Sequence, residues 1–88
     1  RAEVFEIDVG PDAVVAGQTL QEAAEAGLIG EDILLVAIER NGEAEPITPH
    51  GGTTLHAGDR VTVYSAIGAT PDVTDVFGHY ENHNGADS

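Results

Sequence analysis

The sequence has no cysteine, methionine, tryptophan or lysine, and it has only two tyrosines and two phenylalanines in 88 residues. Without cysteine, the chain can form neither disulfides nor thiolate-bound zinc sites. A chain of this length forms one domain, which buries only about 60–65% of the surface that the unfolded chain exposes. Since disulfides are excluded, we expect part of the stability to come from contact with a partner surface.

Positive charge is nearly absent. Three arginines, Arg1, Arg40 and Arg60, stand against 16 Asp and Glu residues, which gives a formal net charge of −13. Binding to nucleic acid needs clustered Lys and Arg, so we expect no nucleic-acid partner. The apolar residues, 41% of the chain, occur in periodic blocks and predict a folded domain. The acidic surface indicates a halophilic protein, because molar salt screens the self-repulsion of its charges.

Long hydrophobic runs are missing as well. No run approaches the roughly 20 residues of a membrane span, or the apolar stretch of a signal peptide. The first residue is Arg1 and not methionine. We therefore expect a soluble domain that was excised from a larger protein.

No residue set suggests catalysis. None of the Ser and Thr hydroxyls stands in a nucleophile motif, and Gly51-Gly52 lacks the Lys and the following helix of a phosphate loop. Five carboxylates could supply oxygens to calcium or magnesium: Glu31, Asp32, Glu43, Glu45 and Asp59. EF-hand spacing is absent, however, and neighbouring carboxylates are typical of so acidic a surface. We expect no enzyme, no cofactor and no metal site.

The first half of the chain predicts a strand and a short helix. Residues 3–9 alternate apolar and polar side chains, as in a half-buried strand, and Gly10 ends this pattern. Thr19, followed three residues later by Glu22, is a capping box, so a helix begins there and ends near Gly27. Its alanines favour close packing of this helix on a sheet.

The middle of the chain predicts a hairpin. Residues 33–38 are apolar at every position, and the Asn41-Gly42 pair that follows is a strong signal for a type I′ turn. We expect residues 43–47 to pair with residues 33–38 as antiparallel strands. Across this hairpin, Arg40 is expected to pair with a nearby carboxylate or, as the alternative, to contact a ligand. The nearby carboxylates are Glu39, Glu43 and Glu45.

A strand that is apolar on both faces must be covered on both faces. The helix supplies one cover for residues 33–38, and we expect a second copy of the chain to supply the other. The predicted dimer interface includes Val36 and Ile38. Replacing either residue with aspartate should then give monomers.

The remaining pattern completes the predicted fold. Residues 60–65 alternate again and predict another strand, and Pro71 begins a short helix that reaches Phe77 and ends at Gly78. Residues 79–88 carry no apolar pattern and are expected to form a flexible tail. The predicted class is α+β, a small sheet of antiparallel or mixed strands in β-α-β-β-β order with a short C-terminal helix.

Three motifs occur in an order that is known from one family. An apolar strand ends in Arg and a turn with Gly, a Pro-x-Gly-x-Thr-x-Leu segment follows, and Gly-Asp precedes a Val-rich strand. In this sequence the motifs occupy residues 34–42, 49–55 and 57–63. Over residues 3–77 the chain resembles the TrkA C-terminal (RCK C-terminal) domain family. The resemblance implies a domain over residues 1–78.

The resemblance implies a non-enzymatic regulatory domain that pairs as a homodimer at the cytoplasmic end of a membrane transport protein. Such domains belong to potassium-uptake regulators, potassium channels, cation/proton antiporters and ClC-type chloride channels. They bind a small ligand or sense an ion, and the response of the dimer biases the transport pore. The implied partners are a second copy and the rest of the parent transporter. The alternative is a pure assembly domain that binds no ligand.

Several members of the family bind cyclic di-AMP between two subunits, so a nucleotide is one candidate effector and a cation is another. The resemblance places the ligand cleft of this chain around Ile38, Arg40, Ile47 and Pro49. The relatives that bind this ligand have a basic residue in the helix and Asn before the apolar strand. At those positions this chain has Glu25-Ala26 and Asp32, which offer no positive charge to a phosphate.

Overall fold

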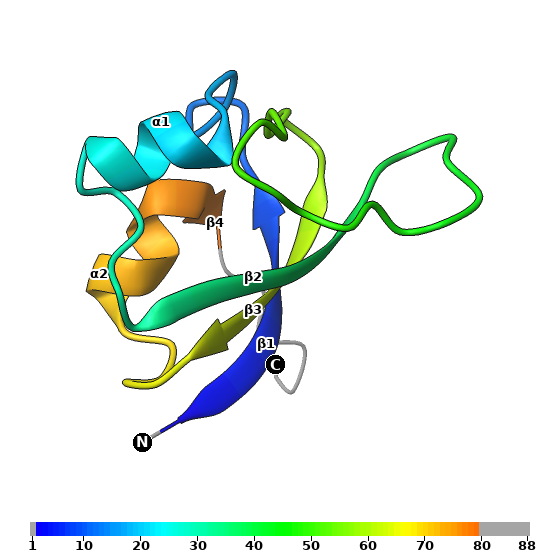
Figure 1. Ribbon diagram of the computed structural model, residues 1–88. Helices are drawn as coiled ribbons and strands as arrows, with labels where there is room; N and C mark the ends of the chain where they lie inside the picture. Colours follow the sequence, from blue (N-terminus) through cyan, green and yellow to red (C-terminus); the bar gives the residue numbers. More distant parts are fainter. Residues whose placement is uncertain (1, 80–88) are drawn as a thin grey trace.

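The computed structural model describes residues 2–79. Its elements are, in chain order, β1 (Glu3–Val9), α1 (Leu20–Glu25), β2 (Ile33–Glu39), β3 (Arg60–Ser65), α2 (Pro71–Thr74), the 3-10 helix η1 (Asp75–Phe77) and β4 (Gly78–His79). Figure 1 shows the helical segments on one side of the strands and the loop after β2 projecting on the other side. Helix and sheet thus form two layers.

The strands form one antiparallel sheet in the order β2-β3-β1-β4. The ladders of β3 with β1 and with β2 extend along most of these strands, whereas β4 adds only two residues beside the end of β1. The α+β class therefore fits the structure. In the described part of the chain, β2 is an edge strand of the sheet.

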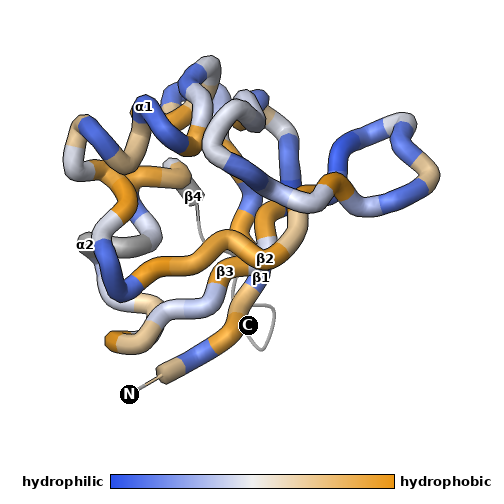
Figure 2. The backbone as a smooth tube through the Cα atoms, in the orientation of Figure 1, coloured by the Kyte–Doolittle hydropathy of each residue, from blue (hydrophilic) through white to orange (hydrophobic). Residues whose placement is uncertain are grey.

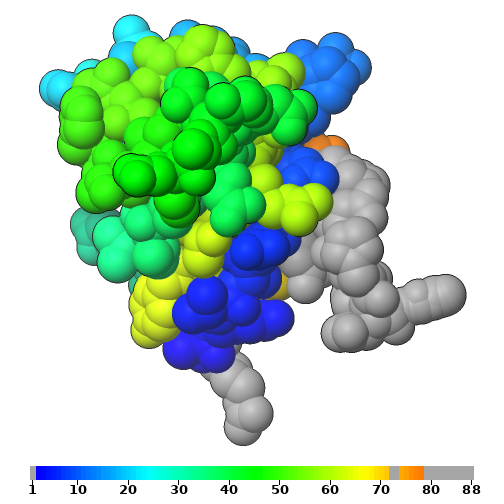
Figure 3. Space-filling model, turned by 90° about the vertical axis from the view of Figure 1, so that its right-hand side faces the viewer, coloured from blue at the N-terminus to red at the C-terminus, as the bar shows by residue number. Residues whose placement is uncertain are grey.

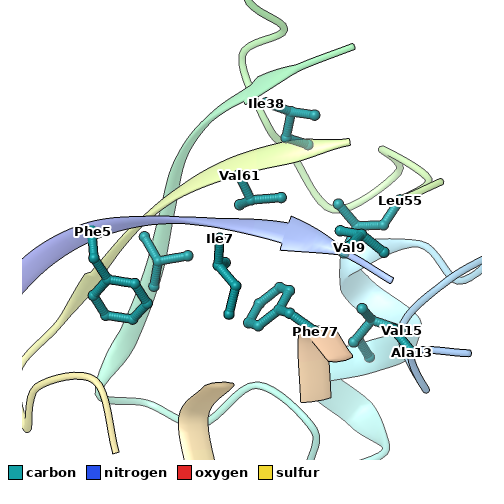
Figure 4. Close-up of a cluster of buried hydrophobic side chains, with 11 residues drawn as sticks. Phe5, Ile7, Val9, Ala13, Val15, Ile38, Leu55, Val61 and Phe77 are labelled. Atoms are coloured by element: carbon teal, nitrogen blue, oxygen red, sulfur yellow. The ribbon is translucent and has the colours of Figure 1, made fainter. Parts of the chain in front are cut away.

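The core lies between the sheet and the helical layer. Alternate side chains of β1 and β3 are buried, so one face of the sheet is apolar and covered while the other face is open. The buried apolar residues are Phe5, Ile7, Val9, Ala13, Val15, Ala23, Ile38, Leu55, Val61, Val63 and Phe77. Figure 4 shows Phe77, at the end of η1, beside Ile7 of β1. Phe77 thereby fixes the last helical segment to the sheet.

The predicted capping box at the start of α1 is confirmed. The hydroxyl of Thr19 accepts a hydrogen bond from the backbone N–H of Glu22 (3.1 Å), and the Glu22 carboxylate accepts one from the N–H of Thr19 (2.9 Å). These two bonds satisfy backbone donors that a helix start leaves without partners. Gly27 follows the helix with a positive φ of 79°, which ends it. The helix is six residues long and buries Ala23.

The predicted strand at residues 43–47 is wrong. Only one pair joins this segment to β2: the N–H groups of Ile38 and Ile47 each donate to the carbonyl of the other, at 3.0 and 2.7 Å. Pro46 has no N–H to donate to a ladder, and residues 43–45 offer no large apolar side chain to bury. The segment is therefore an exposed loop, which Figure 2 shows as largely hydrophilic.

The turn at Asn41-Gly42 also differs from the prediction. The N–H of Glu43 donates to the carbonyl of Arg40 (3.0 Å), so the chain does turn there. Gly42 has a positive φ of 86°, whereas no residue other than glycine has a positive φ among residues 2–79. A type I′ turn requires a positive φ at both central residues, so this turn is of another type. The turn therefore lacks the backbone twist by which a type I′ turn matches the two flanking strands of a hairpin.

At the end of the chain, α2 begins at Pro71 and η1 continues it to Phe77. The expected tail at residues 79–88 starts within a strand, because His79 pairs with Asp8 of β1. The order of strands predicted from the sequence is thus corrected: the segment at 43–47 contributes no strand, and β4 adds one at the opposite edge. The remaining expected tail, residues 80–88, lies outside the described residues.

Candidate functional site

An apolar groove lies between α1 and the edge strand β2, and we call it the α1–β2 groove. Its volume is about 430 Å³. The lining residues are Leu20, Gln21 and Ala24 of α1, Ile29, Ile33, Leu34 and Leu35 of β2 and the segment before it, and Pro49, His50 and Gly51 of the following loop. Gln21 and His50 are the side chains with polar groups among them. The groove can therefore accept an apolar surface, with hydrogen-bonding groups available at two positions.

Backbone hydrogen bonds hold the loop against the helix and so shape this groove. The N–H of Leu20 donates to the carbonyl of Thr53 (2.9 Å), and the N–H of Gln21 donates to the carbonyl of Gly51 (2.9 Å). These N–H groups lie in the first turn of α1, where no carbonyl of the helix can accept from them. The Pro-x-Gly-x-Thr segment thus completes the start of α1, and Pro49 is placed at the groove as a result.

A second site of interest is the ion pair between Arg40 and Asp59. The guanidinium donates to both carboxylate oxygens of Asp59, from Nε and Nη2 at 2.9 Å each, and Nη2 also donates to the carbonyl of Thr54 at 2.9 Å. Only 2% of the Asp59 side chain is exposed, against 29% of the Arg40 side chain. The pair joins the end of β2 to the turn before β3. A bidentate pair of this kind fixes the geometry of both segments.

The model of the TrkA-C domain family matches residues 4–78. The chain belongs to the TrkA-C domain family. This family consists of regulatory, non-catalytic domains of ion transport proteins. No curated protein matches the chain. Within residues 2–79, none of the helices is both long and apolar enough to cross a membrane.

In this TrkA-C domain, the four residues predicted to surround a ligand do not line one cavity. Ile38 is fully buried in the core and Ile47 packs against that core. Pro49 lines the α1–β2 groove, whereas Arg40 lines a different cleft of about 560 Å³ beside the loop at 41–46. Of the four residues, Pro49 is the one that lines the α1–β2 groove.

The predicted interface residues are also placed differently from one another. The ladder between β2 and β3 shifts register between Leu35 and Ala37, so Val36 is the extra residue of a bulge, and 49% of it is exposed. Ile38, by contrast, has no exposed surface in a single chain. Val36 is available for contact with a second copy, and Ile38 is a core residue whose replacement would test folding instead.

The predicted partners of Arg40 are wrong. Its carboxylate partner is Asp59, and neither Glu39 nor Glu45 forms an ion pair with it within residues 2–79. Glu43 adds only a longer-range attraction. From the sequence, Asp59 was considered only as a possible cation ligand, although the Gly-Asp pair before β3 belongs to the same family signature as Arg40. The shared signature was the signal that could have joined these two residues.

The carboxylates considered for a cation do not gather in the structure. Among the described residues, no group of three or more His, Asp or Glu side chains could hold a metal ion. Asp59 already accepts hydrogen bonds from Arg40 and from the N–H of His56 (2.9 Å). Glu43 and Glu45 lie on the exposed loop, and Glu31 and Asp32 lie before β2. These side chains form a solvated acidic surface.

Acid should weaken the domain through Asp59. Burial acts to raise the pKa of this carboxyl, but the hydrogen bonds from Arg40 and the His56 N–H outweigh it, so the pKa lies below its ordinary value. The resulting stabilisation is complete above the ordinary Asp pKa of about 3.9, and it is lost as the pH falls from there through the lowered value. Urea unfolding of the wild type and of Asp59→Asn, at neutral pH and near pH 3, measures this contribution. The wild type and Asp59→Asn should differ less in free energy of unfolding near pH 3 than at neutral pH. An equal difference at both pH values would contradict the stabilising role of the ionised Asp59 carboxylate.

Proposed function

We propose that this TrkA-C domain is a cytoplasmic regulatory module that acts as a dimer in its ion transport protein, and that a second copy covers β2 and the α1–β2 groove. The observation that carries the proposal is the exposed position of β2 in the sheet. It is an edge strand of the described sheet, it has 62% of Leu34 and 49% of Val36 exposed, and it borders an apolar groove. An edge strand with exposed apolar side chains is a surface that readily pairs with another chain.

The chemistry of the groove favours contact between proteins. Eight of its ten lining residues are apolar or glycine, with Gln21 and His50 as the exceptions. An apolar surface of this kind gains free energy when water is excluded from it, by about 25 cal/mol per Å² of apolar area. A domain of 88 residues has a modest core, so covering this surface would add stability that the single chain lacks. Dimerisation would then couple the folding of two regulatory modules.

Replacing Val36 with aspartate should convert the dimer to monomers. The side chain is exposed in the single chain, so the change leaves the core intact, but in the dimer it would bury an uncompensated charge. Val14→Asp is the matched control, because 54% of Val14 is exposed in the loop before α1, away from β2 and the groove. Light scattering on a sizing column measures both variants. A Val36→Asp variant that stays dimeric, or a Val14→Asp variant that dissociates equally, would contradict the proposed interface.

A second candidate function is sensing of a small effector in the same groove. The observation that favours it is the volume of about 430 Å³, which lies within the range of about 300–1,000 Å³ for ligand pockets, together with the hydrogen-bonding groups of Gln21 and His50. The family resemblance makes a cyclic dinucleotide the first effector to test. In this case the groove holds the ligand between two copies, and binding of the ligand alters the contact between the two copies.

Thermal unfolding in the presence of cyclic di-AMP, other nucleotides or divalent cations tests this second candidate. A ligand at 100 times its Kd should stabilise the domain by about 2.7 kcal/mol, which raises the unfolding midpoint by roughly 10–20 °C for a domain of this size. Ala24→Glu places a charge in the groove and should abolish the shift, whereas Ala57→Glu, on an exposed turn away from the groove, should preserve it. If no compound shifts the midpoint of the wild type, the assembly function alone remains.

A further inference from the structure

The face of the sheet that the helices leave open has an ordered distribution of side chains. Paired residues of neighbouring strands point to the same side of a sheet, so the pairing defines rows across it. The apolar row consists of Val4, Tyr64 and Leu34 on β1, β3 and β2. The charged row, at the other end of the same strands, consists of Asp8, Arg60 and Glu39. A middle row of Glu6, Thr62 and Ala37 separates the two.

The apolar row is exposed to solvent. Val4 and Leu34 have 63% and 62% of their surface exposed, and Tyr64 between them is exposed as well. Figure 3 shows side chains of β1, in blue, and of β3, in yellow, side by side on this surface. Three exposed apolar side chains in one row form a continuous contact surface, whereas single exposed residues carry no such meaning.

The charged row has an excess of negative charge. The one cation in these three rows, Arg60, donates from Nε to Asp8 at 3.0 Å. Glu39 and Glu6 face the same guanidinium, and no ion pair neutralises either of them within residues 2–79. Beyond this row lies the cleft of about 560 Å³ beside the loop at 41–46, where Glu43 and Glu45 add two more carboxylates. Arg40 also lines this cleft, but its charge is paired with Asp59. Negative charge is therefore concentrated at one end of the open face.

We propose that the open face binds a basic amphipathic helix of another polypeptide segment, with the apolar residues of that helix on the apolar row and its Lys or Arg side chains at the charged row. Val4 and Asp8 are four residues apart on β1, which is about 13 Å along a strand. A helix covers the same distance in about nine residues. The fitting segment thus has apolar residues in one part and basic residues two to three turns away.

Charge complementarity decides between this occupant and a second copy of the chain. A second copy has no Lys, a net charge of −13 and, on this face, the same excess of carboxylates. Pairing two such faces would oppose like charges at a cost, whereas a basic helix replaces that repulsion with attraction. The dimer proposed above shares Leu34 with this face but otherwise uses the edge of β2 and the groove. Val4 lies outside the dimer surface and Val36 lies outside the apolar row, so these two residues test the two contacts separately.

Synthetic peptides measured by fluorescence anisotropy against the full 88-residue chain test this proposal. The probe is a helical peptide with leucines in one half and lysines in the other, used in both chain directions, because the face does not fix the direction of the helix. The control peptide has glutamates in place of the lysines. The lysine peptide, in at least one direction, should bind about tenfold more tightly than the glutamate peptide, and its affinity should fall with added salt. Equal affinities for the two would overturn the proposal.

Variants of the chain locate the contact. Val4→Asp should weaken binding of the lysine peptide by about tenfold or more, and the matched Val14→Asp, similarly exposed (54% against 63%) but on a loop, should leave it unchanged. Glu39→Gln should weaken binding less, while retaining the apolar contact. Circular dichroism checks that each variant is folded. If Val4→Asp and Val14→Asp bind alike, the site is elsewhere; if Val4→Asp yields monomers, a second copy occupies this face and the proposal is wrong.

Discussion

Replacing Phe77 with alanine should destabilise the domain by about 3–5 kcal/mol, the cost of removing a fully buried phenylalanine and leaving a cavity. Total stability for 88 residues is of the order of 4–13 kcal/mol, so this single change removes a large part of it. The reason is the position of Phe77, which fixes η1 to β1 beside Ile7. Urea unfolding at a fixed protein concentration measures the loss.

Tyr64→Ala is the matched control for that measurement, because it also removes an aromatic ring, but from the open face of the sheet. Its effect should be smaller, since 37% of Tyr64 is already exposed to water in the wild type, whereas Phe77 is fully buried. The Phe77→Ala variant should also lose the pairing of β4 with β1, because β4 follows Phe77 directly. Equal destabilisation by the two changes would mean that η1 does not pack on the sheet as described.

Replacing Arg40 with alanine should cost about 2–3 kcal/mol, at or just below the range of about 3–5 kcal/mol for breaking a fully buried ion pair, because the guanidinium is partly exposed. The change leaves the buried Asp59 carboxylate without its bidentate partner and the Thr54 carbonyl without a donor. The loop from Pro49 to Leu55 should loosen as a result. Hydrogen exchange at the N–H of Leu55, which donates to the Gln18 carbonyl at 2.9 Å, would report that change.

The matched control is Arg60→Ala, which breaks the other ion pair of the described residues, between Arg60 and Asp8. Both of these side chains are substantially exposed, so water replaces the lost contact and stability should change little. The two arginines thus separate a buried pair from an exposed one on the same small sheet. If both variants were equally stable, Arg40 would not hold the turn before β3 to the end of β2.

Local signals in the sequence predicted β1, β3 and the start of α1. The alternation at residues 3–9 and 60–65 depends only on which side chains face the core, and the two side chains of the capping box lie three residues apart. Such signals are contained in the segments that they describe.

The errors have a common physical cause, because they concern contacts that no local pattern encodes. Asn41-Gly42 is a strong hairpin signal by itself, but the ladder after it fails where Pro46 lacks a donor and the neighbouring side chains have no surface to cover. β4 has two residues and forms only because η1 brings it beside β1. A segment of that length has no periodicity to detect.

At the predicted site, too, the errors concern contacts that no local sequence pattern encodes. Residues adjacent in the sequence suggested Glu39, Glu43 or Glu45 as partners of Arg40, but the partner is Asp59, 19 residues away. Ile38 was expected at an interface because its strand is apolar throughout, yet the bulge at Val36 turns Ile38 into the core and leaves Val36 at the surface. A one-residue irregularity reverses which side chains face outward, and the sequence pattern does not mark its position.

Light scattering of the wild-type chain over a wide range of concentrations, in potassium chloride at a concentration that keeps it folded, is the most direct test of the proposed regulatory dimer. The chain has a mass of 9.1 kDa. We expect a mass twice that of the chain, which falls towards a single copy only on strong dilution. A mass of one chain at every concentration would contradict the proposal that a second copy covers β2 and the α1–β2 groove.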